Sequence, residues 1–295
     1  MANRYRTTTK IIHKCIIFFH LDEWIARWAV DYPFIRKFVP SPHLYSGTLK
    51  KIKRNKAWFV IDPSDYMQWH IFAGIKEIAW QKAVEVAESV DNESIILDIG
   101  SNVGAFALKV ACNMPANSKT HIFAFDPNPL IKKMFLTNLS INKGAKPNIT
   151  FVLSAAGNAN KEVEFSFDPS NSGAGKIDGK QAMSFNSSVI TLDSFAEMNK
   201  LNNICFIKID VEGFEPFVFE GAKKIITKYR PHIYFEITEQ WHRKYGRSSR
   251  EIFEFLISLD YDIYTDEKGT FKKTFCYFQQ AESNFQNNFL ASPKA

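Results

Sequence analysis

The chain has 295 residues, of which 45% are hydrophobic, so its length and apolar content suffice for a large folded domain with a true core. The composition excludes a disordered, collagen-like or disulfide-dense protein. The longest apolar runs fall well short of the ~20 residues that span a bilayer, which excludes a protein with several membrane spans.

Charge is unevenly distributed along the sequence. Residues 1–56 contain twelve Lys and Arg against three Asp and Glu, a balance of +9, whereas the rest contains 25 and 28, a balance of −3. Such asymmetry indicates contact with a membrane surface, a nucleic acid or an acidic substrate, or simply a solvated arm. We therefore expect residues 1–60 to form a basic, partly helical extension and residues 61–295 to form the main domain.

The four cysteines are widely spaced and form no Cys-x-x-Cys pair, which argues against a structural zinc site. Scattered thiols fit a reducing compartment. His13 and Lys14 interrupt the apolar stretch near the basic N-terminus, and no cleavage site follows clearly, so this stretch does not resemble a signal peptide. We predict a cytoplasmic protein, with peripheral membrane contact through residues 1–56 as an open alternative.

The extension is predicted to begin with an apolar, aromatic helix over residues 11–30. This helix carries Trp24 and Trp28 together with several cations, so it either lies on an anionic membrane or packs on the main domain. A loop with three prolines and the basic run of residues 50–54 is expected to follow.

From about residue 75 onward, short apolar runs alternate with helical patterns. Strands are predicted at residues 95–99, 121–125, 149–153, 204–209, 232–237, 261–264 and 274–278. This alternation predicts an α/β fold with a doubly wound, mostly parallel sheet of seven strands. The last two strands are joined by a short turn at residues 267–269 and should therefore pair antiparallel. An inserted hairpin is predicted from residues 163–167 and 188–190, joined by the polar residues 168–184.

The strongest chemical signal is the loop Asp98-Ile-Gly100-Ser-Asn102-Val-Gly104, which ends the first strand and opens a helix. Its glycines allow a tight turn and a close approach of a ligand to the backbone. A dinucleotide loop of the form Gly-x-Gly-x-x-Gly would need glycines at 102 and 105, so NAD binding is not supported. An acidic residue before the glycines instead suits a cofactor with a positive amino group, such as S-adenosylmethionine.

Asp126 lies at the tip of the second strand, 22 residues after Gly104. A carboxylate there can accept two hydrogen bonds from the diol of a ribose. The alternative is that Asp126 only caps the next helix, for which Asn128 is the predicted N-cap.

The segments Ile96–Gly104 and Phe123–Pro129 resemble the first two motifs of the FkbM family of S-adenosylmethionine-dependent methyltransferases. Val189–Phe195 and the block Ile207-Lys-Ile-Asp-Val-Glu-Gly-Phe-Glu215 continue the resemblance, which covers about residues 65–280. It implies a Rossmann-like class I methyltransferase sheet with strand order 3-2-1-4-5-7-6 and an antiparallel seventh strand. Asp126 departs from the family, which more often has Glu there, and the extension inherits nothing from the resemblance.

The resemblance implies that S-adenosylmethionine lies across the carboxyl ends of the first three strands. Glu77 resembles an acidic position that touches the methionine end of the cofactor, although it would equally fit a solvent-facing helix position. Ala155, among small residues after the third strand, is expected beneath the adenine. The residues predicted to bind the cofactor are Glu77, Asp98, Gly100, Asn102, Gly104, Asp126, Asn128 and Ala155.

Methyl transfer to a hydroxyl requires removal of its proton by a side chain or a bound metal. Asp210, at the end of the fourth strand, is the first candidate as base or as metal ligand, and Glu212 could share a cation such as Mg²⁺ with it. Lys208 points to the same face and could hold Asp210 ionised; alternatively these three residues form a structural ion network. Glu236 either reaches the acceptor or is a buried carboxylate bonded to backbone amides. His232 and His242 are weaker candidates for a base.

The resemblance implies O-methylation of a hydroxyl on a sugar, a glycan or another secondary metabolite. The basic extension keeps RNA methylation open as an alternative. Against it, no Asn/Asp-Pro-Pro-Tyr/Phe block follows the fourth strand, and stacking on a base would also need an aromatic residue there. A non-catalytic protein that binds S-adenosylmethionine is a further alternative. The oligomeric state is left open.

Overall fold

The computed structural model describes residues 2–45, 47–75, 77–90, 93–145, 148–168, 171–177, 182–267, 269–275, 277–282 and 287–294. The helices are α1 (Ala2–Phe18), α2 (Asp22–Asp31), α3 (Tyr66–Phe72), α4 (Ala79–Ser89), α5 (Ala105–Asn113), α6 (Pro129–Ile141), α7 (Leu192–Met198), α8 (Glu215–Glu220), α9 (Lys223–Tyr229), α10 (Glu239–Lys244), α11 (Ser249–Ser258) and α12 (Tyr277–Glu282), with 3-10 helices at Pro33–Phe38 and Pro42–Leu44. The strands are β1 (Lys50–Arg54), β2 (Ala57–Ile61), β3 (Ile95–Ile99), β4 (His121–Phe125), β5 (Ile149–Val152), β6 (Ala155–Ala156), β7 (Lys161–Asp168), β8 (Asn171–Ile177), β9 (Met183–Ile190), β10 (Ile204–Ile209), β11 (His232–Ile237), β12 (Tyr261–Asp266), β13 (Phe271–Lys273) and β14 (Asn287–Pro293).

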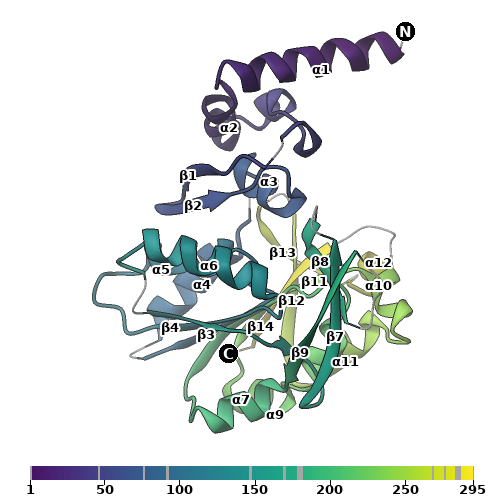
Figure 1. Cartoon of the computed structure of the whole chain (residues 1–295). Helices are drawn as coiled ribbons and strands as arrows, with labels where there is room; N and C mark the ends of the chain where they lie inside the picture. Colours follow the sequence, from purple (N-terminus) through teal and green to yellow (C-terminus); the bar gives the residue numbers. More distant parts are fainter. Residues whose placement is uncertain are drawn as a thin grey trace.

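The main sheet has the order β13-β12-β14-β11-β10-β3-β4-β5 (Figure 1). The five strands β5, β4, β3, β10 and β11, which are neighbours in this order, pair in parallel. Strand β14 is antiparallel to both of its neighbours, β11 and β12. The predicted α/β fold and the class I methyltransferase strand order are therefore confirmed. The β12–β13 hairpin is antiparallel as predicted, and it adds an eighth strand at the edge.

The position of the seventh strand was predicted wrongly. Residues 277 and 278 begin α12 instead of continuing a strand, and Cys276 lies outside the described residues. The place between β11 and β12 is filled by β14, which lies later in the chain. The prediction chose the apolar run nearest to the short turn at residues 267–269. The seventh strand of the sheet is formed instead by residues 287–293.

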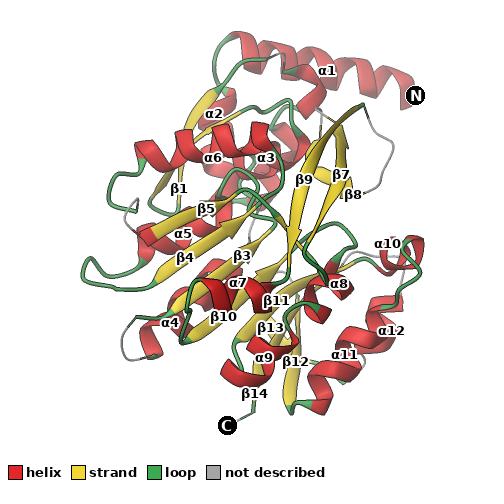
Figure 2. Ribbon diagram, turned by 60° about the horizontal axis from the view of Figure 1, so that its bottom comes forward, coloured by secondary structure: helices red, strands yellow, loops and turns green. Residues whose placement is uncertain are grey.

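Helices cover both faces of the main sheet (Figures 1 and 2). On one face, Ile96 and Phe206 pack in a core cluster with residues of α4, α5 and α6. On the other face, Leu97 and Ile207 pack with residues of α7, α8, α9 and α11. Because both faces are covered, the central strands are apolar at almost every position, as expected for a parallel sheet.

The inserted segment forms a separate sheet with the order β6-β9-β7-β8, which stands beside the carboxyl end of the main sheet (Figure 2). The predicted hairpin is present as β7 and β9, which pair antiparallel over seven residues. The prediction that residues 168–184 only join these strands was wrong in part, because residues 171–177 form β8. Strand β8 contacts α3, so the insert and the N-terminal region meet over the carboxyl end of the main sheet.

The single helix predicted over residues 11–30 is two helices. The chain leaves α1 through His20, whose φ of 54° is incompatible with a right-handed helix, and α2 begins at Asp22. Asp22 is fully buried and binds Lys50 at 3.0 Å and the Tyr45 hydroxyl at 3.1 Å. The basic run that was expected in a loop forms β1. Along this strand the buried residues Lys50, Ile52 and Arg54 alternate with the exposed residues Lys51 and Lys53.

Strand β2 is attached to the main domain through Asn138 of α6 and Asn142, which caps the C-terminal end of that helix. The Asn138 side chain accepts a hydrogen bond from the Val60 amide at 2.6 Å, and the Asn142 side chain pairs with both backbone groups of Trp58. The extension is thus bonded to the domain along an otherwise open strand edge. The domain boundary near residue 60 stays a prediction. Within the described part of the chain, no helix has the length and apolar character needed to cross a membrane.

Candidate cofactor and acceptor site

A cavity of about 620 Å³ lies at the carboxyl ends of the main strands, within the usual range for small-molecule sites. Its floor is formed by the loops that follow β3, β4, β5 and β10, where the strand order reverses, as expected for a doubly wound sheet. Residues of α3, such as Tyr66, and of the inserted sheet, such as Phe165 and Ile177, form its walls.

The loop after β3 requires glycine for reasons of backbone packing. Gly100 has a φ of +81°, and a Cβ atom there would lie 1.8 Å from the backbone oxygen of Asp210. Gly104 has a φ of +90° and immediately precedes α5. These two glycines let the loop turn tightly against β10, which brings Ser101 and Asn102 to the cavity.

Asp126 lines the cavity beside this loop. Its Oδ2 atom accepts a hydrogen bond from the Asn102 amide at 3.1 Å, and its Oδ1 atom accepts one from the Asn128 amide at 2.9 Å. Burial raises its pKa to about 6, although both backbone hydrogen bonds oppose the shift. Asn128 does not line the cavity; its side chain caps α6 by accepting from the Leu130 amide, as predicted.

A row of polar side chains crosses three parallel strands below the cavity. Asp98 of β3 is paired in register with Lys208 of β10, which is paired with Tyr234 of β11. The Lys208 Nζ atom lies 3.1 Å from Asp210 Oδ2 and 3.8 Å from Asp98 Oδ1. Burial alone would lower the pKa of Lys208, but the carboxylates of Asp210, Asp98 and Glu77 together raise it. The three carboxylates therefore favour the charged form of the buried Lys208.

Asp98 is fully buried, and neither of its carboxylate oxygens has a hydrogen-bond partner among the described residues. Burial raises its pKa to about 7, against the opposing charge of Lys208. Asp98 does not itself line the cavity but lies just beneath it. Ser101, which does line the cavity, also has a buried hydroxyl without a partner in the described structure.

Glu77 lines the cavity from the segment between α3 and α4. Its Oε2 atom lies 3.3 Å from Nζ of Lys109, a largely buried lysine of α5 that lines the cavity too. The predicted alternative of a purely solvent-facing position is therefore wrong for Glu77. It belongs to the same wall as the loop after β3.

Residues of β11, β12 and β14 form a further wall of the cavity. Glu236 is paired in register with Asn288 of β14, and the Tyr234 hydroxyl donates to Asp266 of β12 at 3.3 Å. All four side chains line the cavity. Trp241 of α10 adds an aromatic surface to the same cavity.

Three of these lining residues, Tyr234, Asp266 and Asn288, were missed from the sequence. Tyr234 could have been found, because it lies two residues before Glu236 and so faces the same side of the strand. Asp266 and Asn288 carried no such signal, since their place depends on where β14 enters the sheet.

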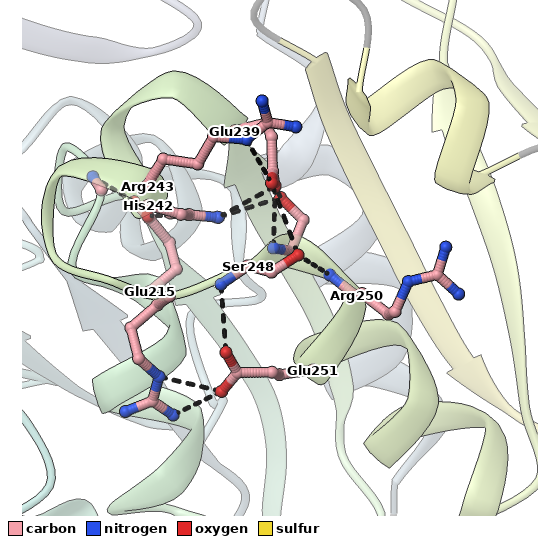
Figure 3. A network of polar contacts seen from close by, with 10 residues as sticks. Glu215, Glu239, His242, Arg243, Ser248, Arg250 and Glu251 are labelled. Atoms are coloured by element: carbon pink, nitrogen blue, oxygen red, sulfur yellow. Dashed lines mark hydrogen bonds and ion pairs between the residues drawn. The ribbon is translucent and has the colours of Figure 1, made fainter.

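The loop after β10 is held from behind by a buried network (Figure 3). Glu215 Oε1 accepts from the amides of Val211 and Gly213, and Glu215 Oε2 lies 2.8 Å from Nε2 of His242. The other ring nitrogen of His242 contacts Ser249, which donates to Glu239. Both nitrogens of this fully buried ring are engaged, so His242 supports the loop and is no base for the acceptor.

His232 likewise does not line the cavity. It begins β11, at the opposite end of the strand from the cavity, and its Nδ1 atom lies 3.0 Å from the Ser292 hydroxyl. Burial lowers its pKa to about 4.

The structure brings most of the predicted site residues together. Those that line the cavity are Glu77, Gly100, Asn102, Asp126, Ala155, Lys208, Asp210, Glu212 and Glu236, whereas Asp98, Gly104 and Asn128 lie behind it. In the part of the chain that is described, no group of three or more His, Cys, Asp or Glu side chains is arranged to hold a metal ion. The metal site at Asp210 and Glu212 therefore stays a prediction.

Comparison with known proteins agrees with the resemblance found in the sequence motifs. The sequence profile of the Methyltransferase FkbM domain matches residues 98–263, which is more than half of the chain. A comparison with curated protein sequences found no match.

Several solved structures are similar to this chain. A SAM-dependent methyltransferase from Agrobacterium tumefaciens is similar at a TM-score of 0.50 and 8% identity, covering 84% of this chain and 71% of that one. Methyltransferase FkbM from Methylobacillus flagellatus KT is similar at a TM-score of 0.46 and 14% identity, covering 86% of this chain. This chain spans only about half, 51%, of the length of the Methylobacillus protein.

Proposed function

Because the chain belongs to the FkbM methyltransferase family, whose methyl donor is S-adenosylmethionine, we propose that it methylates a hydroxyl of a neutral or basic, polyhydroxylated acceptor. The acceptor class we favour is a sugar, a glycan or a similar secondary metabolite. The observation that carries this proposal is the charge of the cavity. Among the described residues that line it, carboxylates outnumber lysines. The carboxylates are Glu77, Asp126, Asp210, Glu212, Glu236 and Asp266, and the lysines are Lys109 and Lys208.

The residues of the cavity fit the cofactor. Asp126 uses one lone pair of each carboxylate oxygen for a backbone amide, which leaves acceptor capacity for the two hydroxyls of a ribose. The unpartnered Ser101 hydroxyl and the acidic Glu77 and Asp98 suit the polar, amino-bearing methionine end. Ala155 offers the flat, small surface that an adenine ring needs. We assign cofactor binding to these residues on that basis.

The charge of the cavity selects against anionic acceptors. Each lysine of the lining is already paired with a carboxylate, Lys109 with Glu77 and Lys208 with Asp210. No arginine occurs among the described lining residues, and arginine is the side chain best suited to phosphates and carboxylates. Carboxylates accept hydrogen bonds from hydroxyl and ammonium groups, and aromatic rings such as Trp241 pack against the apolar faces of sugars. These features favour polyols and amino sugars over phosphorylated compounds, and they disfavour RNA.

When bound, S-adenosylmethionine supplies a methyl group on a positively charged sulfur that is already an activated leaving group. The protein has to hold the acceptor in line, which can contribute ~7–11 kcal/mol, and to receive the proton of the acceptor hydroxyl. We assign proton acceptance to Asp210, which lies at the cavity and is oriented by Lys208. Glu236 is then the residue that binds a neighbouring hydroxyl. A Mg²⁺ ion shared by Asp210 and Glu212 is the alternative means of ionising the hydroxyl.

The test is transfer of labelled methyl groups from S-adenosylmethionine to a panel of neutral oligosaccharides, amino sugars, sugar phosphates and RNA. We expect label in neutral or basic sugars only. Asp210→Asn should abolish transfer while its cofactor affinity stays within about twofold of wild type, whereas Glu236→Gln should mainly raise KM. Asp262→Asn is the matched control, because Asp262 lies outside the cavity in an exposed ion pair.

The outcomes separate the alternatives. Preferential labelling of RNA or of sugar phosphates would refute the charge argument. Cofactor binding without transfer to any acceptor would favour the non-catalytic protein. Loss of transfer after treatment with EDTA, restored by Mg²⁺, would assign the ionisation of the hydroxyl to the metal and not to Asp210 alone.

A further inference from the structure

The outward face of α1 is apolar and has no partner among the described residues. Ile11 and Phe18 are 58% and 76% exposed, and together with the exposed Cys15 they follow the i, i+4, i+7 spacing of one helix face. His13 and Ile16 lie on the opposite face and are buried. The helix is therefore already packed on its inner side, and the apolar residues of its outer side do not contribute to the core.

Helix α2 and the residues that follow it expose a row of aromatic rings. Trp24 and Trp28 have their ring centroids 5.0 Å apart, Tyr32 lies 5.9 Å from Trp28, and Phe34 lies 6.1 Å from Tyr32. All four rings are exposed, whereas Ala26 and Ala29 on the inner face are fully buried. Single exposed apolar residues are ordinary, but contiguous patches of this kind mark interaction sites.

The surface also carries positive charge. Lys10, Lys14, Arg27 and Lys37 are exposed on the same segment, where they outnumber the exposed acidic residues Glu23 and Asp31. A second copy of this chain would bring like charges together, so self-association through this face is disfavoured. A complementary partner must offer both an apolar layer and negative charge, and these are the properties of an anionic lipid surface.

We propose that the outer faces of α1 and α2 form a membrane-binding surface, with the helices lying in the plane of an anionic bilayer interface. Trp and Tyr rings are the side chains that favour the headgroup region, and lysines and arginines beside them contact anionic lipids. In Figure 1, both helices lie at the end of the molecule opposite α7 and α9, so nothing in the described structure obstructs this approach.

The surface is connected to the cavity by hydrogen bonds. The Arg36 guanidinium donates to the carbonyls of Ala73 and Gly74 after α3, and the Trp69 indole donates to the carbonyl of Pro40. Because α3 also contributes Tyr66 to the cavity wall, membrane binding would hold the cavity in a defined orientation to the lipid.

The experiment is cosedimentation of the full chain with phosphatidylcholine vesicles, with and without phosphatidylglycerol. We expect binding to the anionic vesicles that weakens with added salt. The double variant Trp24→Ala/Trp28→Ala and the triple variant Lys10→Glu/Lys14→Glu/Arg27→Glu should each reduce partitioning more than about tenfold. The urea-unfolding midpoints of both variants should match that of the wild type, which shows that the variants are folded whether or not the proposed function holds.

Matched controls make the same kinds of change outside α1 and α2. Leu136→Ala/Phe275→Ala removes two exposed apolar side chains, and Lys223→Glu/Lys224→Glu/Lys228→Glu reverses three exposed charges on α9. Both controls should bind vesicles as the wild type does. Equal binding by the tryptophan variant and the wild type would overturn the proposal. It would also be overturned if no vesicle bound and the wild type proved to be a dimer that the tryptophan variant dissociates.

Discussion

Replacing Gly100 by alanine should damage both the fold and the site. The residue has a φ of +81°, and the added Cβ would lie 1.8 Å from the backbone oxygen of Asp210. Real Cβ atoms essentially never come closer than 3.0 Å to such an atom, so the loop and β10 would have to separate by about 1.2 Å (3.0 minus 1.8). The obstacle is backbone and cannot rotate away as a side chain could.

The cost has two parts. A left-handed conformation costs a non-glycine residue ~1–2 kcal/mol, and overpacking of a well-packed interior costs typically ~1–3 kcal/mol, which gives a loss of about 2–5 kcal/mol. Because the displaced atom belongs to Asp210, methyl transfer should fall even in the fraction of molecules that remain folded.

Urea unfolding of three variants separates the two parts. Gly47→Ala adds a Cβ in open space at a φ of +57° and should cost only the backbone strain. Gly144→Ala adds a Cβ in open space without a positive φ and should be nearly neutral. The reasoning would be refuted if the free energies of unfolding of Gly100→Ala and Gly47→Ala agreed within about 0.5 kcal/mol, since the contact with Asp210 would then cost nothing.

Further predictions concern the buried titratable groups. Because burial raises the pKa of Asp126 to about 6 and only its ionised form accepts two hydroxyl hydrogen bonds, the affinity for S-adenosylmethionine should fall as the pH drops through about 6. Calorimetric titration checks this, and a flat profile from about pH 8 to about pH 5 would contradict it. The pKa of Asp98 is raised to about 7, so its ionisation progressively destabilises the fold as the pH rises from about 4 to about 7. Asp98→Asn should therefore stabilise the protein by about 2–3 kcal/mol more at about pH 8 than at about pH 5, as measured by urea unfolding. His242→Ala leaves the Oε2 atom of the buried Glu215 without its imidazole partner and should cost about 3 kcal/mol, whereas Arg243→Ala, at an exposed position beside it, should cost under about 0.5 kcal/mol.

Local motifs were predictable because their geometry is encoded within a few residues. Asp126 and Asn128 follow a strand directly and precede a helix, so their roles at the strand end and the helix cap needed no tertiary information. The same holds for the loop from Asp98 to Gly104, where chain direction and glycine spacing define the turn. The fold class followed from the apolar runs that a sheet covered on both faces demands.

What depends on distant pairing could not be predicted. The segment Asn287–Pro293 begins with two polar residues and ends in proline, so nothing in it indicates a strand at the centre of a sheet. Asp266 and Asn288 reach the cavity only because this segment lies between β11 and β12. The break between α1 and α2 also had no signal, because no proline or glycine occurs near His20 and both flanking segments favour helix.

The place of β14 has a consequence for how the chain acquires its structure. Strands β11 and β12 follow one another along the chain but do not pair. In the described structure, β12 and its hairpin partner β13 join the sheet only through β14. Until residues 287–293 have left the ribosome, two strand edges lie open in the middle of the molecule, and open edges invite pairing with other chains. Synthesis that stops shortly before residue 287 would therefore yield a split and aggregation-prone product, although every cofactor-binding residue proposed above would already be present.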